Sequence, residues 1–219
     1  MAETSATPDL PLYLEEPGLW VQNLAGTERT TGRPALFLDR DGTINVDTGY
    51  PRSPDEIVLL PKILPVIRAA NAAELPAIIV SNQSGVARGL LDWRDFAKVN
   101  QRLLELLAAE NCAIAMVLAC AYHEKGRPPL DIADHPMRKP NPGMFRRAAV
   151  LLGLDLAGSI VVGDKASDME AGRRAGVAAG WLIGDEQADE RDFATRRLRD
   201  AADYAALERS ISASANSRS

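Results

Sequence analysis

Short apolar runs alternate with stretches of helical periodicity through most of the chain. The runs are rich in Val, Ile, Leu and Ala, as buried strands are, and they cover residues 35–38, 77–80, 113–119, 159–162 and 177–183. Between them, apolar residues recur every three or four positions, for example at Phe96, Val99 and Leu103. Strands that alternate with helices at this spacing predict an α/β fold: a central parallel sheet between two helical layers, in a Rossmann-like α/β/α arrangement.

Two of the expected helices carry start signals. Asp92, with Asp95 three residues later, is expected to cap the helix that contains Phe96. Asn141 followed by Pro142 predicts the N-cap and first position of another helix, which should end near Gly153.

The two ends of the chain differ from this alternating part. Residues 1–33 are rich in Pro, Thr, Glu and Gly but include Leu19 and Trp20, so we expect an N-terminal arm packed on the core, with a disordered tail as the alternative. Residues 34–209 should form one α/β domain. Residues 210–219 predict a flexible, low-complexity tail.

Composition narrows the class of protein. A net charge of -5 over 219 residues argues against general binding of nucleic acid. Cys112 and Cys120 are the only cysteines, so no disulfide framework is expected and the cytoplasm is the default location. The N-terminus lacks signal-peptide features and no apolar run is long enough to span a membrane, so no membrane association is expected.

Carboxylates follow directly after two of the expected strands. Asp39 and Asp41 come after the first strand, and Asp164 follows the fourth. One acid of the first pair can act as nucleophile and the other can move protons, although an ordinary Asp-Gly turn at Gly42 is the alternative. Three clustered acids require a cation, and oxygen ligands suit Mg²⁺. Asp168 could bind the metal, cap a helix or orient Lys165, and we expect capping or orientation.

Potential phosphate ligands stand at two other strand or helix ends. Ser81 begins a Ser-Asn-Gln-Ser-Gly stretch after the second strand, where a polar loop is the alternative. Arg88 adds a guanidinium suited to phosphate. Arg138 and Lys139 precede an expected helix N-terminus, which itself favours anions.

In this order, Asp39-x-Asp41-Gly42-Thr43, Ser81, Lys139 and Gly163-Asp164-x-x-x-Asp168 resemble the four motifs of the haloacid dehalogenase (HAD) superfamily of phosphotransferases. The resemblance spans residues 35–183. It implies a Mg²⁺-dependent phosphatase with Asp39, Asp41, Ser81 and Lys139 as catalytic residues. The metal ligands it implies are the side chains of Asp39 and Asp164 and the backbone carbonyl of Asp41.

The longer stretches DRDGTINVDTGY, SNQSGVARG, RKPNPGM and VGDKASDM resemble the family of heptose 1,7-bisphosphate and histidinol-phosphate phosphatases. The Asp47-Thr48-Gly49-Tyr50 segment is typical of its heptose branch. This resemblance implies removal of the C7 phosphate from D-glycero-D-manno-heptose 1,7-bisphosphate through an aspartyl-phosphate, in ADP-heptose and lipopolysaccharide biosynthesis. The residues it implies for substrate binding are Asp47, Gly49, Tyr50, Asn82, Gln83, Ser84, Arg88, Arg138 and Lys165. The alternatives are a phosphatase for histidinol phosphate or another small sugar phosphate, and a catalytically silent sugar-phosphate-binding protein.

The spacing of the motifs leaves no room for a cap domain, because only about 40 residues separate Asp41 from Ser81. A capless protein is therefore expected, and the resemblance implies a monomer, because the capless relatives are usually monomers. Many relatives carry a structural zinc in the loop before Arg138, but here the ligand pattern is broken, with His135 and a methionine in place of cysteines. Zinc is not expected, although Cys120, His123 and His135 are candidates for a degenerate site.

Overall fold

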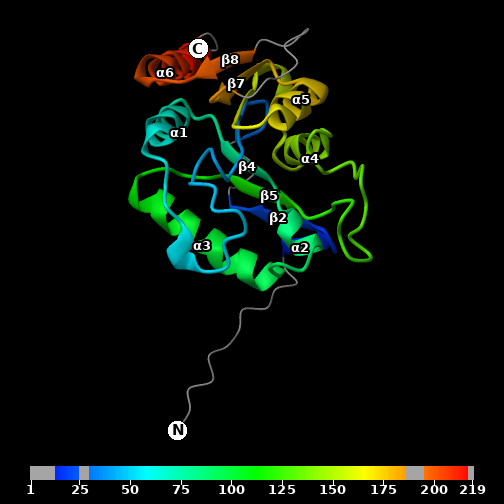
Figure 1. Cartoon of the computed structure of the whole chain (residues 1–219). Coiled ribbons are helices and arrows are strands. Elements are labelled where there is room, and N and C mark those ends of the chain that lie inside the picture. The colour runs from blue at the N-terminus through cyan, green and yellow to red at the C-terminus, as the bar shows by residue number, and fades with distance from the viewer. Residues whose placement is uncertain (1–12, 25–29, 186–194, 217–219) are drawn as a thin grey trace.

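The computed structural model describes residues 13–24, 30–185 and 195–216, which are organised around one eight-stranded sheet (Figure 1). The strand order across the sheet is β1-β2-β5-β4-β3-β6-β7-β8. The strands are β1 (Leu14–Glu16), β2 (Leu19–Asn23), β3 (Leu36–Leu38), β4 (Ala77–Asn82), β5 (Met116–Cys120), β6 (Ile160–Gly163), β7 (Ala179–Ile183) and β8 (Thr195–Leu198).

The five strands predicted from apolar runs form the parallel part of the sheet, with β8 added in parallel beside β7. β5 begins three residues later than expected, at Met116. β1 and β2 were not predicted as strands, and β2 pairs antiparallel with β5. Leu19 and Trp20 of β2 are buried, so residues 14–23 of the expected arm extend the sheet.

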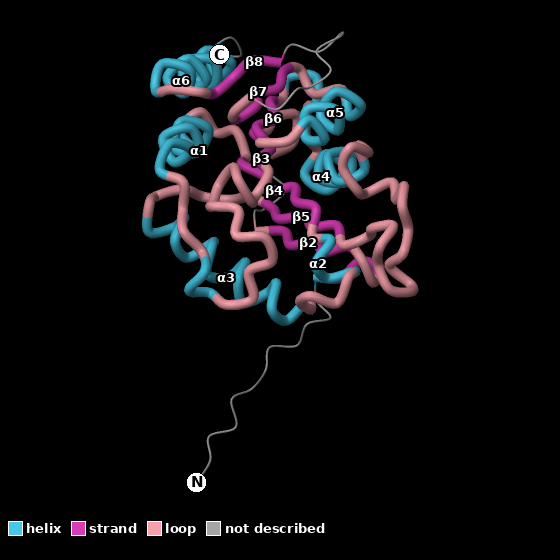
Figure 2. The backbone as a smooth tube through the Cα atoms, viewed as in Figure 1, coloured by secondary structure: helices cyan, strands magenta, loops and turns pink. Residues whose placement is uncertain are grey.

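Helices cover both faces of the sheet (Figure 2). One face carries α1 (Leu64–Ala72), α3 (Trp93–Ala109) and α6 (Ala201–Asn216), and the other carries α4 (Gly143–Leu152) and α5 (Ala166–Ala175). The short helices are α2 (Ser84–Ala87), η3 (Pro54–Glu56), η4 (Pro61–Ile63) and η5 (Leu156–Gly158). The predicted three-layer α/β fold is therefore confirmed.

The side chains of β3 alternate between the two faces of the sheet, so helices must cover both faces. Leu36 and Leu38 belong to the core on the side of α1 and α3, whereas Ala35 and Phe37 belong to the core on the side of α4. Phe37 contacts Phe145 of α4 at a ring-centroid distance of 4.7 Å. A strand buried on both faces is apolar at every position, as parallel strands usually are.

The helix boundaries agree with the sequence at one start and differ at another. Asp92 caps α3 together with Asp95, as predicted. The start of α4 was predicted wrongly by one residue: Pro142 is the N-cap and Gly143 the first helical residue. The amide of Asn141 instead donates to Asp134 at 2.6 Å, which takes that side chain away from the helix end. α4 ends, as predicted, at Gly153, which has φ +66°.

No cap domain lies between the sequence motifs in the described residues. Between Asp41 and β4 the chain forms only η3, η4 and α1, and residues 121–142 contain no helix or strand. At the C-terminal end α6 continues to Asn216 with Ile211 buried, so helix replaces most of the tail expected from residue 210. None of the described helices has the length and apolarity to span a bilayer.

Candidate active site

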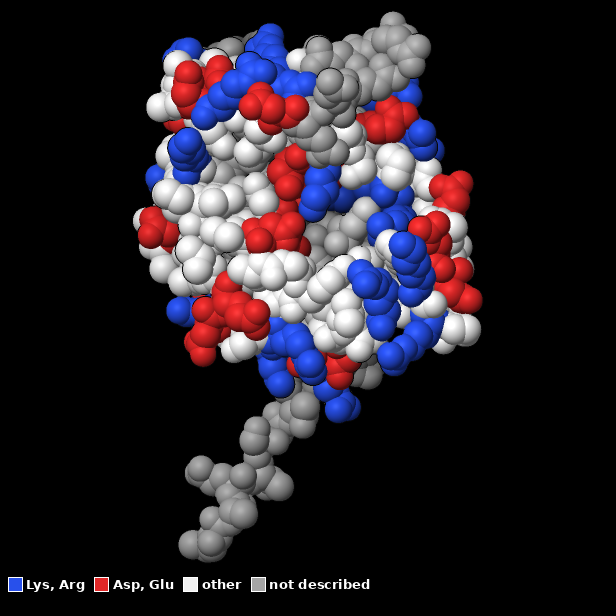
Figure 3. All heavy atoms as spheres, viewed as in Figure 1, with Lys and Arg blue, Asp and Glu red and all other residues white. Residues whose placement is uncertain are grey.

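The predicted catalytic residues meet where three neighbouring parallel strands end. Asp39 follows β3, Ser81 lies near the end of β4, and Asp164 follows β6. β3 lies between the other two strands, so the carboxyl ends of all three are adjacent. Open α/β sheets bind ligands at this edge. In Figure 3 acidic side chains occupy the middle of the visible face, and basic side chains gather beside them.

Lys139 reaches this edge from the loop between β5 and α4. Its Nζ lies 2.6 Å from Asp39 Oδ1 and 2.6 Å from Asp168 Oδ1, and it donates to the carbonyl of Val80 at 2.7 Å. The lysine is 3% exposed. Burial alone would lower its pKa, but Asp168 and Asp39 raise it above the usual lysine value, so the ammonium stays charged.

Asp39 is a buried carboxylate whose charge the protein only partly offsets. Burial raises the pKa of Asp39 to about 7; Lys139 opposes this rise, and the neighbouring carboxylates Asp168 and Asp41 add to it. A group that acts as an ionised nucleophile at neutral pH therefore needs additional positive charge nearby.

The carboxylate of the neighbouring acid, Asp41, is held by Arg40, Asn45 and Gln83. The Arg40 guanidinium contacts this carboxylate through Nε at 3.1 Å and Nη2 at 2.8 Å, and Asn45 donates to Oδ1 at 3.0 Å. Burial alone would raise the pKa of Asp41, but Arg40, Asn45 and Gln83 lower it below its usual value. Sequence reasoning missed Arg40 and Asn45; the arginine between the two acids was the available signal.

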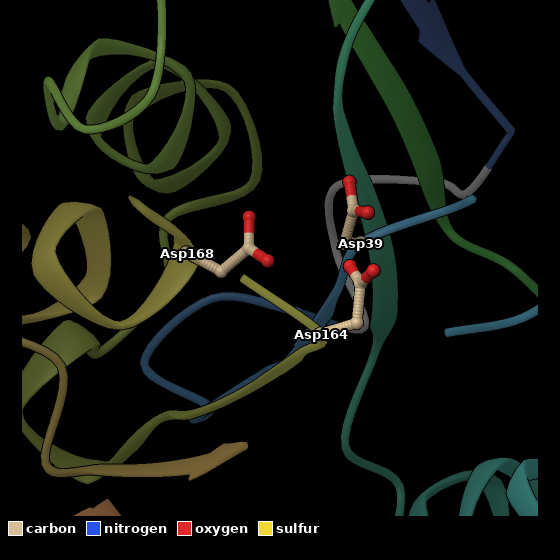
Figure 4. Close-up of side chains that lie close together, drawn as sticks. All are labelled: Asp39, Asp164 and Asp168. Atoms are coloured by element: carbon tan, nitrogen blue, oxygen red, sulfur yellow. The ribbon is translucent and has the colours of Figure 1, made fainter. Parts of the chain in front are cut away.

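Three carboxylates form a candidate cation site. Asp39, Asp164 and Asp168 each place one oxygen within 4.8 Å of the other two (Figure 4). Asp164 Oδ1 is buried and has no hydrogen-bond partner, and burial raises the pKa of this acid. These oxygen donors, with an orphaned acceptor among them, fit a hard divalent cation such as Mg²⁺.

The three acids are not equally available to a cation. Asp168 caps α5, as predicted, because its Oδ2 accepts from the Lys165 backbone N–H at 3.0 Å, while its Oδ1 pairs with Lys139. Both of its oxygens are thus engaged, whereas Asp164 keeps one free. The Asp41 carboxylate is outside the cluster, and the sequence prediction concerned its backbone carbonyl.

The two amide side chains that follow Ser81 make hydrogen bonds to residues of the site. Asn82 bonds to both backbone polar groups of Lys139: it donates to the carbonyl at 2.9 Å and accepts from the N–H at 3.1 Å. Gln83 is 5% exposed, and its Nε2 donates to both Asp41 and Ser81 at 2.9 Å. Both amides, expected as substrate ligands, therefore contact protein groups; Ser84 begins α2 and is partly exposed.

Residues 47–50 are exposed, and Tyr50 of this segment contacts Arg88. The Tyr50 hydroxyl accepts from Arg88 Nη1 at 2.6 Å, and the guanidinium also lies over the tyrosine ring. Asp47 accepts from the N–H of Gly49, which has φ +91°, so these residues form a tight turn. Lys165 Nζ lies 3.6 Å from Asp47 and 3.9 Å from Asp164, which connects this turn to the carboxylate cluster.

Arg138 lies beside these residues in the loop that follows β5. Its Nη1 donates to the carbonyl of Tyr122 at 3.1 Å. The candidate zinc residues of the same loop do not meet: within the described part of the chain, Cys120, His123 and His135 belong to no group of ligand atoms close enough to share an ion. His135 instead stacks on Tyr122.

Known proteins resemble this chain in sequence. A family model described as HAD-hydrolase-like matches residues 136–197. A Mesorhizobium japonicum protein named D-glycero-beta-D-manno-heptose-1,7-bisphosphate 7-phosphatase is 55% identical over 207 residues, which cover 94% of each chain. A Burkholderia mallei protein named as the alpha-anomer enzyme is 40% identical over 70% of this chain and 82% of its own length.

Solved structures resemble the chain as well. A putative HAD-like phosphatase from Mesorhizobium loti matches with a TM-score of 0.88 at 54% identity, over 92% of this chain and 97% of its own. A D,D-heptose 1,7-bisphosphate phosphatase from B. bronchiseptica, complexed with magnesium and phosphate, matches with a TM-score of 0.65 at 31% identity, over 80% and 97% of the two chains.

Proposed function

This chain belongs to the HAD superfamily and, within it, to the family of the heptose-1,7-bisphosphate 7-phosphatases, and we propose that it hydrolyses the C7 phosphate of D-glycero-D-manno-heptose 1,7-bisphosphate. The observation that carries the proposal is the meeting of Asp39, Asp41, Ser81, Lys139 and Asp164 at one sheet edge. The 55% identical relative is named for the beta anomer, and we propose the same preference here.

Asp39 is the proposed nucleophile. Lys139 holds Oδ1 of Asp39 at 2.6 Å, so the other oxygen is the one left to attack phosphorus in line with the leaving alkoxide. The product of this step is an aspartyl-phosphate. The buried Ser81 hydroxyl donates to an equatorial phosphoryl oxygen. The Lys139 ammonium, whose three N–H groups are directed at Asp39, Asp168 and Val80, offsets the phosphoryl charge electrostatically.

Asp41 is the proposed acid and base. With the negatively charged substrate bound, Asp41 takes up a proton and donates it to the leaving sugar alkoxide. The ionised Asp41 then removes a proton from the water that hydrolyses the aspartyl-phosphate. Both oxygens of Asp41 accept hydrogen bonds within the protein. One of these bonds must give way when the substrate oxygen arrives.

Asp39 and Asp164 are the proposed side-chain ligands of Mg²⁺, together with the Asp41 backbone carbonyl. The bound cation supplies positive charge that favours the ionised form of Asp39 and offsets charge on the transferring phosphoryl group. Asp168 holds Lys139 and the start of α5 and is not proposed as a ligand.

The substrate enters on the side of residues 47–50. Arg138 and Arg88 are the proposed contacts to the distal phosphate, because both carry guanidinium groups beside the exposed Tyr50. Asp47, Gly49, Tyr50 and Lys165 are the proposed contacts to the sugar, and Ser84 is proposed to assist at the start of α2.

We also propose that the enzyme acts as a monomer in the cytoplasm and without a structural zinc. One chain supplies every residue of the proposed mechanism, and both cysteines are free thiols. Light scattering on the purified protein tests the monomer: a mass near 23.6 kDa supports it, and a mass near twice that value contradicts it.

Phosphate release tests the proposed activity. We expect wild type with Mg²⁺ to hydrolyse the beta-anomer bisphosphate faster than the alpha anomer, histidinol phosphate or hexose bisphosphates. Asp39→Asn should lower kcat by more than about 1,000-fold, since the nucleophile is removed. Asp55→Asn, an exposed acid on η3, is the matched control and should leave kcat unchanged. A wild type as inert as Asp39→Asn on every ester would show a silent binding protein.

A further inference from the structure

One amide nitrogen connects two of the proposed catalytic residues. Gln83 Nε2 lies 2.9 Å from Asp41 Oδ2 and 2.9 Å from Ser81 Oγ. The Gln83 backbone is fixed on both sides, because its N–H donates to the Cys120 carbonyl at 2.7 Å and its carbonyl accepts from Val86 at 3.1 Å. The side chain is buried, so water does not compete for these bonds.

Hydrogen-bond chemistry dictates the orientation of this amide. An ionised carboxylate can only accept, so the NH₂ end of Gln83 must face Asp41. The second hydrogen of that NH₂ then points to Ser81 Oγ. Because Ser81 accepts this bond, its own O–H hydrogen is directed elsewhere and can be donated to a phosphoryl oxygen.

We infer that Gln83 is a positioning residue that aims the Ser81 hydroxyl at the phosphoryl group and holds Asp41 beside the leaving oxygen. The inference rests on the proposed roles of Ser81 and Asp41. It assigns no substrate contact to Gln83, whose NH₂ hydrogens are both used inside the protein.

The variant Gln83→Met keeps the length of the side chain and removes both donors. Assays with two phosphate esters separate its effect on Asp41 from its effect on Ser81. The heptose bisphosphate releases an alkoxide that needs a proton from Asp41, whereas 4-nitrophenyl phosphate releases a stable phenolate that does not. We expect kcat/KM to fall about 100-fold for the sugar ester and about tenfold for the aryl ester. In a Ser81→Ala background, Gln83→Met should cause no further fall in kcat/KM for the aryl ester.

Controls separate positioning from damage to the fold. Gln101→Met makes the same substitution on an exposed α3 residue whose amide donates to Glu105, and it should leave kcat/KM unchanged for both esters. Gln83→Glu keeps the shape of the side chain but presents a carboxylate to Asp41. It should increase the difference between the falls in kcat/KM for the sugar ester and the aryl ester. Thermal denaturation of each variant checks the fold.

Two results would overturn the inference. Equal losses on both esters would show a general structural role, and losses on the aryl ester that multiply with Ser81→Ala would show that Gln83 does not act through Ser81. In both cases wild type remains active and the proposed function stands. A wild type inert on both esters overturns the proposed function and the inference together.

Discussion

The ring of Tyr122 stacks on the imidazole of His135, with centroids 3.7 Å apart and planes inclined by 18°. The stack holds the turn that leads to Lys139. His135 accepts from the backbone N–H of Met137 through its ring Nδ1 and from that of Arg138 through its backbone carbonyl, and the Arg138 guanidinium donates to the Tyr122 carbonyl. Glu16 of β1 lies against both rings, 3.4 Å from the phenol oxygen and 3.9 Å from the imidazole. The N-terminal strands and the active-site loop are thus packed together.

Tyr122→Leu should therefore affect both stability and substrate binding. We expect the free energy of unfolding to fall by about 2 kcal/mol, from lost aromatic contact in a buried position, and KM to rise more than kcat falls. Tyr122→Phe keeps the ring and should retain most of both properties. Chemical denaturation and initial rates measure the two effects; a Leu variant with wild-type stability would contradict the bracing role.

His135 should give this packing a pH dependence. Burial lowers the pKa of His135 below its usual value of 6.5, although Glu16 opposes the shift. The folded state therefore favours the neutral ring. The stabilisation that comes from burying this neutral ring is complete above pH 6.5 and is lost as the pH falls below that value. His135→Gln should reduce the loss of stability between pH 7 and 5, as followed by urea denaturation. An unchanged pH slope would show that His135 does not contribute.

Arg40 should matter for stability through Asp41. Arg40 is buried, lies over the Phe96 ring and pairs with the partly buried Asp41 carboxylate. Arg40→Met leaves that carboxylate unpaired and should lower the unfolding free energy by about 3 kcal/mol at pH 7. The missing cation raises the pKa of Asp41, so protonation should shrink the deficit as the pH falls toward 4.

The control for Arg40 is an exposed arginine of α1. Arg68 pairs with Glu110 at 3.8 Å in solvent, and Arg68→Met should cost less than about 1 kcal/mol at any pH. Arg40→Lys, which keeps the charge, should fall between the two. A pH-independent deficit in Arg40→Met would indicate lost packing and not an unpaired charge.

The sequence predicted the parts of the fold that depend on local burial. Runs such as 77–80 are apolar at every position because parallel strands are covered on both faces, and Asp39 and Asp164 stand out because charge follows such runs directly. β8 gave no such signal: it lies at the sheet edge, and two of its four residues are arginines. Edge strands tolerate charge, so their pattern resembles that of loops.

Side-chain partners were less predictable than positions. Nothing in the sequence distinguishes a glutamine that binds substrate from one that donates to Asp41 and Ser81, because the difference is the direction of one buried amide. Asn141 likewise carries a helix-capping signal, and its amide bonds to Asp134 across the loop instead. These choices depend on tertiary contacts that local propensity does not encode.

Both cysteines should be unreactive in the folded protein. Burial raises the pKa of Cys120 to about 12 and also raises that of Cys112, so neither forms the thiolate that reacts with disulfide reagents. We expect no release of thionitrobenzoate from Ellman's reagent until the protein unfolds, and two equivalents in denaturant. Fast labelling of Cys120 in the native state would contradict its burial.

The same thiol bears on the proposed absence of zinc. A cysteine binds zinc as its thiolate together with further ligands, and within the described residues Cys120, His123 and His135 are not close enough to share an ion. Protein purified without added metal should contain well under one zinc per chain, and a chelator should leave its melting temperature unchanged. Stoichiometric zinc that resists dialysis would overturn the proposal.

Gly42 should be required for the metal site and not only for the turn. It has φ +82°, and a Cβ there would overlap the carboxylate of Asp164. Gly42→Ala must therefore displace a proposed Mg²⁺ ligand in addition to straining the backbone by about 1–2 kcal/mol. We expect at least a tenfold rise in the Mg²⁺ concentration for half-maximal activity.

Gly176→Ala is the matched control: Gly176 has φ +87° but no neighbour within 4 Å, so this variant should lose similar stability and leave the Mg²⁺ dependence unchanged. Equal Mg²⁺ requirements in the two variants would show that the close approach of Gly42 to Asp164 does not position that carboxylate for the cation.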